Sequence, residues 1–87
     1  LPSVTYTVEI LRTAQKELGK INRPDQDRII DAIQSLSEAP RPSGCLKLSG
    51  REAWRIRIGS YRVIYEVHDN RLVVLVVQIG HRMDVYR

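Results

Sequence analysis

The feature that most constrains the fold is a pair of alternating segments separated by two residues, Gly59 and Ser60. Polar and apolar residues alternate with a period of two in Ala53–Ile58 (AWRIRI) and in Tyr61–His68 (YRVIYEVH), which is typical of half-buried strands. A two-residue connection with glycine first favours a tight hairpin with a type II′ turn. The register of this hairpin places opposite one another Ile58 and Tyr61, Arg57 and Arg62, Ile56 and Val63, and Arg55 and Ile64.

This register sorts the side chains of the hairpin onto two faces, because successive strand residues point to opposite sides of a sheet. One face is apolar and is predicted to pack on the helices: Trp54, Ile56, Ile58, Tyr61, Val63 and Tyr65. The other face carries Arg55, Arg57 and Arg62. Like charges directly opposite each other destabilise a sheet by about 0.2–1 kcal/mol, so the opposition of Arg57 and Arg62 indicates an anionic ligand. Glu66 shares that face, and an arginine–glutamate surface lattice is the alternative explanation.

The first half of the chain predicts a strand followed by two helices. Thr5–Ile10 alternates like a strand, and Gly19 is expected to end a first helix. Pro24 suits the first turn of a second helix, which is expected to end before the Pro40–Pro42 segment. Each helix has one apolar stripe, namely Leu11, Ala14, Leu18 and Ile21 in the first and Ile29, Ala32, Ile33 and Leu36 in the second.

The second half predicts strands joined by short turns. Beyond the loop Arg41–Gly44, Leu46–Leu48 is expected to form a short edge strand. Arg71–Ile79 is expected to form a strand joined to Tyr61–His68 by a two-residue type I′ turn at Asp69-Asn70. Its stretch Leu72–Val77 is apolar on both faces, which indicates a central strand.

Together these elements predict a single α+β domain over residues 1–87. An N-terminal strand and a helix hairpin would pack in two layers on a mainly antiparallel sheet of four to five strands.

Composition excludes several function classes. With one cysteine (Cys45) and two histidines among 87 residues, neither an internal disulfide nor a zinc quartet is expected, and no metal, cofactor or small-molecule ligand is predicted. No apolar run approaches the ~20 residues of a membrane-spanning helix. The first residues lack the basic start and apolar centre of a signal peptide. We therefore expect a cytoplasmic protein without a membrane partner.

Positive charge is concentrated in the second half of the chain. The net charge is +4 overall, but residues 41–87 contain nine basic and four acidic residues, and eight of the nine are arginine. Arginine grips phosphate through two-point contacts, so a phosphate-bearing or acidic partner is expected for this half. Four residues near the C-terminus add a titratable imidazole, two cations and a phenol able to stack on a base: His81, Arg82, Tyr86 and Arg87.

An apolar strip is also predicted on the arginine side of the last strand, formed by Val73, Leu75 and Val77. An apolar exposure of this kind on a small protein usually meets another surface. A segment of an acidic partner protein could fold over it, or the C-terminal residues of the chain itself could cover it; both possibilities remain open at this point.

The order and spacing of four stretches resemble the RelE-like toxins of bacterial type II toxin–antitoxin systems, in the RelE/ParE superfamily. These stretches are KLSG (Lys47–Gly50), WRIRIGSYRVIYEV (Trp54–Val67), LVVLVVQIGHR (Leu72–Arg82) and DVYR (Asp84–Arg87). The resemblance implies a ribosome-dependent endoribonuclease that enters the ribosomal A site, cuts messenger RNA, and is held inactive by a cognate antitoxin.

The resemblance implies functional roles for Arg55, Arg57, Arg62, Arg82 and Tyr86. With His81 added for proton transfer, the predicted catalytic set is Arg57, Arg62, Arg82, His81 and Tyr86. The predicted RNA or phosphate contacts are Arg55, Lys47, Arg51 and Arg87. The best-known pattern has lysine where this chain has Arg55 and Arg57, and arginine, being always protonated, cannot act as a base. His81 is then the residue best able to move a proton near neutral pH.

The expected chemistry is metal-independent cleavage by the substrate's own 2′-hydroxyl. Two alternatives share the predicted fold. One is a ParE-like toxin that inhibits DNA gyrase through protein contacts, and the other is a domain that binds RNA without cutting it.

Overall fold

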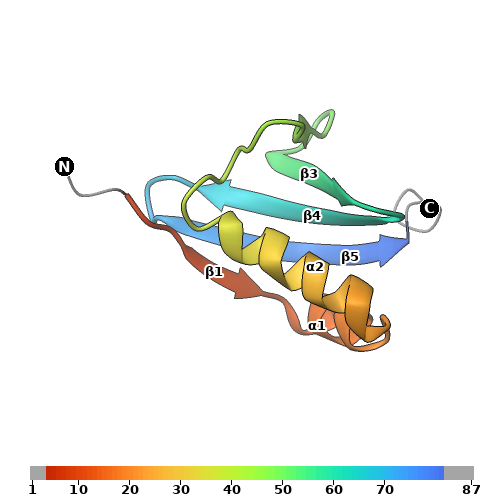
Figure 1. Ribbon diagram of the computed structural model, residues 1–87. Coiled ribbons are helices and arrows are strands. Elements are labelled where there is room, and N and C mark those ends of the chain that lie inside the picture. Colours follow the sequence, from red (N-terminus) through yellow and green to blue (C-terminus); the bar gives the residue numbers. More distant parts are fainter. Residues whose placement is uncertain (1–3, 82–87) are drawn as a thin grey trace.

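Two helices cover one face of a five-stranded sheet in the computed structural model, which describes residues 4–81 (Figure 1). The elements in chain order are β1 (Thr7–Ile10), α1 (Arg12–Gly19), α2 (Arg23–Ser35), β2 (Leu46–Lys47), β3 (Ala53–Ile58), β4 (Tyr61–His68) and β5 (Val73–His81). The strand order is β1-β5-β4-β3-β2, with β1 parallel to β5 and the other pairs antiparallel. The predicted two-layer α+β architecture is confirmed. No helix of the described part is long and apolar enough to cross a membrane.

Local signals fix the ends of the two helices. The Asn22 side chain accepts a hydrogen bond from the backbone N–H of Asp25 (3.2 Å), which caps α2, and Pro24 lies in its first turn as predicted. The Gln26 amide donates to the carbonyl oxygen of Leu18 (3.0 Å), which joins the two helices across their short connection. The helix hairpin is therefore held by its own polar contacts as well as by its apolar side.

The main core lies between the helices and the sheet. Its buried members come from both layers: Ala14, Ile29, Ile33, Leu36, Ile56, Val63, Tyr65, Val74, Val76 and Ile79. Tyr65 is fully buried, and its hydroxyl donates to the carbonyl oxygen of Pro40 (2.7 Å). Burial raises the pKa of Tyr65 above its ordinary value, so this hydroxyl stays protonated and keeps its hydrogen bond.

The β3–β4 hairpin has the predicted register. Arg57 is directly opposite Arg62, and Ile58 is opposite Tyr61 across the two-residue turn. Gly59 has a φ of +59°, while Ser60 has no positive φ, as a type II′ turn requires. The apolar face of this hairpin packs on the helices, which leaves its arginines on the opposite face.

The connection between β4 and β5 differs from the prediction. The ladder pairs His68 with Val73, so four residues, Asp69 to Leu72, make the turn in place of the predicted two, and β5 runs from Val73 to His81. A type I′ turn needs positive φ at both central residues, whereas the positive φ here is at Leu72 (53°).

Contacts from distant segments explain the longer turn. The Asp69 carboxylate accepts hydrogen bonds from the Tyr6 hydroxyl (2.5 Å) and from two nitrogens of Arg41 (2.8 and 3.3 Å). The Arg41 guanidinium carbon lies 5.2 Å from the centroid of the Trp54 ring. Asp69 therefore joins the segment before β1, the linker after α2 and the β4–β5 turn.

A bulge in β5 is the second feature that the sequence pattern does not show. Tyr65 pairs with Val76 but Ile64 pairs with Gln78, so Val77 is an extra residue in the ladder. On the face opposite the helices, Val77 and Leu48 pack against Ala53 and Ile64, which are 1 % and 2 % exposed. The predicted apolar strip is thus half-buried at Val73, Leu75 and Val77.

Candidate nucleic-acid interface

Three arginines lie on the face of the sheet opposite the helices, which we call the arginine face, defined by Arg55, Arg57 and Arg62. Arg57 and Arg62 are directly paired across β3 and β4, and the next residue in the same row is Gly80 of β5. The row Arg57–Arg62–Gly80 therefore crosses three strands and ends at a position without a side chain.

The three arginines differ in burial. Arg57 is exposed, whereas Arg55 and Arg62 are half-buried and their Nε atoms are shielded from solvent. Arginine stems commonly pack along apolar surface while the charged end stays in water. On this face the apolar surface is the cluster around Ile64, which is the residue opposite Arg55. This small cluster therefore lies beside Arg55 on the arginine face.

Glu66, the carboxylate of the alternative lattice explanation, is engaged elsewhere on β4. Its Oε1 lies 2.9 Å from Nε2 of His68, two residues further toward the end of the strand. Glu66 is opposite Ala53, and three residues of β4 separate it from Arg62. The Arg57–Arg62 pair thus lies at the hairpin end of the sheet, and the glutamate–histidine pair lies toward the other end.

His81 shares the hairpin end of the sheet but is on the other face. It is paired with Tyr61, and the two rings meet edge to face with centroids 5.9 Å apart and an interplanar angle of 80°. Tyr61 belongs to the helix side of the sheet. The structure therefore places His81 near the end of the arginine row but across the sheet from it.

Two predicted phosphate contacts lie apart from the arginine row. Lys47 on β2 is opposite Trp54, on the helix side of the sheet, and forms an ion pair with Glu52 (3.3 Å). Arg51 lies in the loop before β3, at the opposite end of that strand from Arg57. The other predicted site residues, Arg82, Tyr86 and Arg87, lie outside the described residues.

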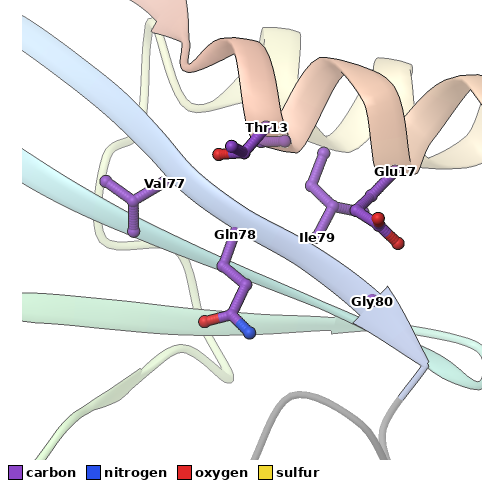
Figure 2. A pocket seen from close by; sticks show the side chains of 7 residues that line it. Thr13, Glu17, Val77, Gln78, Ile79 and Gly80 are labelled. Carbon is purple, nitrogen blue, oxygen red and sulfur yellow. The ribbon is translucent and has the colours of Figure 1, made fainter.

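A cavity of about 380 Å³ opens between α1 and β5, where β1 has ended at Ile10 and β5 continues (Figure 2). Thr13, Ala14 and Glu17 line it from the helix and residues 77–80 line it from the strand. Its charged residue is a carboxylate, which repels phosphate, so the arginine face is the better candidate for a nucleic acid. Within residues 4–81 no cluster of His, Cys, Asp or Glu side chains is arranged to hold a metal ion.

Comparison with known proteins decides the family. Residues 8–86 match the family model described as the ParE toxin of the type II toxin–antitoxin system parDE. This chain belongs to the RelE/ParE superfamily of type II toxins. The superfamily assignment implied by the sequence resemblance is therefore confirmed.

Relatives of this toxin include proteins named for RelE. It is 30% identical over 84 residues to Toxin RelG of Mycobacterium tuberculosis (strain ATCC 25618 / H37Rv), which covers 94% of this chain and 97% of the relative. Its fold matches the archaeal RelE–RelB complex from Pyrococcus horikoshii OT3 with a TM-score of 0.82, 28% identity, and 92% and 98% of the two chains covered. It matches the intact E. coli RelBE toxin–antitoxin complex with a TM-score of 0.77, 28% identity, and 87% and 95% covered.

Proposed function

We propose that this toxin is a ribosome-dependent endoribonuclease that cuts messenger RNA in the ribosomal A site and so inhibits translation. The observation that carries the proposal is the direct opposition of Arg57 and Arg62 on a face that no described helix covers. Like charges directly opposite each other destabilise a sheet, and a phosphate bound between the two arginines would attract both. The relatives named RelG and RelE support a RelE-like toxin, the class for which the sequence resemblance implies this activity.

The proposed reaction needs no nucleophile from the protein. The ribose 2′-hydroxyl next to the scissile bond loses its proton to solvent water and attacks phosphorus. The bond to the 5′-oxygen breaks, this oxygen takes up a proton, and the products are a 2′,3′-cyclic phosphate and a 5′-hydroxyl. Arg57 and Arg62 would hold the nonbridging oxygens and stabilise the charge that develops there. Arg55, one row away on the same face, would hold a neighbouring phosphate.

Proton transfer would fall to the residues around the end of β5. Arginine stays protonated, so Arg55 and Arg57 cannot replace a lysine base. His81 would act as the general acid for the departing 5′-oxygen, which requires the substrate to reach past the end of the strand toward Tyr61. Arg82 would be a cation near the leaving group, and Tyr86 would stack on a base beside the cut or help to orient the 2′-hydroxyl.

A cognate antitoxin is the proposed partner, in addition to the ribosome and its mRNA. Several solved relatives are complexes of a toxin with its antitoxin. An acidic antitoxin segment would neutralise the positive charge of the second half of this toxin. These partners place the proposed site of action in the cytoplasm.

Inhibition of DNA gyrase is a second candidate function, and the match of residues 8–86 to the ParE family model favours it. This activity would act through protein contacts and would not need the Arg57–Arg62 pair. The proposed endoribonuclease activity therefore needs the arginine face, whereas gyrase inhibition does not.

Expression of the toxin in bacterial cells, followed by mapping of RNA 5′ ends on ribosome-bound transcripts, separates the candidates. We expect new 5′ ends within codons, and Arg62→Ala should lower their yield by about 100-fold, the usual loss when one charge-stabilising group is removed. Arg71→Ala is the matched control, because Arg71 is exposed in the β4–β5 turn. DNA damage with intact mRNA would instead establish gyrase inhibition, and RNA binding without cleavage would establish the non-catalytic alternative.

A further inference from the structure

The bulge at Val77 determines which face each later residue of β5 occupies. Before the bulge, Val74 and Val76 point into the main core. After it, Ile79 is in the core and Gly80 is in the row of Arg57 and Arg62. Without the extra residue the ladder would pair Ile79 with Arg62, turn Ile79 out of the core, and turn Gly80 toward the helix side. The bulge thus brings a glycine beside the paired arginines.

The backbone at position 80 does not itself require glycine. Positive φ angles occur at Gly44, Gly50 and Gly59 among the described glycines, and not at Gly80. A glycine inside a strand weakens the strand, and where its conformation is ordinary it commonly marks a place where a ligand or another backbone approaches closely. The backbone of Gly80 also lines the cavity between α1 and β5, but a side chain at this position would share the face of Arg62, so the approach would come from the arginine face.

We propose that Gly80 is a positioning residue: it leaves a seat without a side chain beside Arg62, in which the sugar–phosphate backbone of the RNA lies against β5. The bulge at Val77 places Gly80, and therefore this seat, in the same row as Arg57 and Arg62. The inference rests on the proposed function for its reaction, but the seat itself is a binding feature that can be measured separately. RNA binding would then depend on free space at position 80 as well as on the positive charge of the arginines.

The test compares Gly80→Val and Gly80→Ala with Gln78→Val. Gln78 is exposed on the same strand and is paired with Ile64, so it lies on the arginine face one row away from the Arg57–Arg62 pair. Valine is a good strand former, so if Gly80 had no role Gly80→Val would keep full activity with unchanged or higher thermal stability, and a merely structural role would lower its thermal stability. We instead expect thermal stability at or above that of the unsubstituted toxin together with a loss of cleavage of ribosome-bound mRNA by about 100-fold. Gly80→Ala should lose less, and Gln78→Val should cleave normally.

Affinity for a short single-stranded RNA, measured by fluorescence anisotropy, keeps this inference distinct from the proposed function. If the unsubstituted toxin binds the RNA but does not cut ribosome-bound mRNA, the proposed function fails. The seat is then supported by weaker binding of Gly80→Val and overturned by equal binding. Normal cleavage by Gly80→Val, or equal losses in Gly80→Val and Gln78→Val, would also overturn it. A toxin that neither binds nor cuts RNA would overturn both.

Discussion

At the scale of single residues, the side chain of Asp69 joins segments that lie far apart in the sequence. It accepts hydrogen bonds from Tyr6, 63 residues earlier, and from Arg41, 28 residues earlier. The hydrogen bond from Arg41, followed by that from Tyr6, lowers the pKa of Asp69 below its ordinary value of 3.8. The carboxylate form is therefore the form that holds these segments together.

Replacement of Asp69 with Asn should lower the stability of the toxin at neutral pH and make that stability less sensitive to a fall in pH. Because the folded-state pKa of Asp69 is lowered, its contribution to stability is present above the unfolded pKa and is lost as the pH falls through the folded pKa. Denaturant midpoints measured from pH 7 down to pH 2 would show the effect. Asp31→Asn is the control, since Asp31 is exposed on α2. Identical acid profiles for the two variants would contradict this role.

At the scale of elements, the β3–β4 turn determines that Arg57 and Arg62 are opposite each other. Gly59 is the first of its two turn residues, and a Cβ there would meet no atom within 4 Å, so its constraint is the φ of +59° and not space. A bulge or a longer turn would move Arg62 away from Arg57. The opposition of the two arginines thus depends on one backbone angle.

Alanine at Gly59 should therefore destabilise the toxin, by about 1 kcal/mol or more, because an L residue resists this backbone conformation. Alanine at Gly19, where a Cβ would also meet nothing within 4 Å, should be neutral or stabilising because Gly19 lies in α1 with an ordinary φ. Urea denaturation of both variants measures the difference. Equal midpoints would show that the Gly59 conformation is not needed.

Sequence patterns predicted some connections and missed others for physical reasons. The β3–β4 register was predictable because both strands alternate and the turn residues are explicit. The four-residue β4–β5 turn was not, since Asp69 is held by Tyr6 and Arg41, which no local pattern links to it. The bulge at Val77 was not predictable either, because β5 is apolar at almost every position and its sequence does not show which residues face the helices.

At the scale of the whole molecule, apolar and charged functions are divided between the two faces of the sheet. The helix side holds the main core, and the opposite face holds the arginines with the small cluster around Ile64. The charge pattern of the sequence was enough to predict the arginine face. The placement of His81 was not predictable, because it depends on the phase of β5 after the bulge.

The proposed function depends most on the binding of a nucleic acid beside Arg57 and Arg62. The most direct measurement is the thermal stability and the single-stranded RNA affinity of one variant, Arg57→Thr, compared with Arg71→Thr. We predict that Arg57→Thr gains about 0.2–1 kcal/mol of stability, since the like-charge pair is gone, and loses RNA affinity. Arg71→Thr should change neither. An Arg57→Thr toxin that binds RNA as tightly as the unsubstituted toxin would contradict the account.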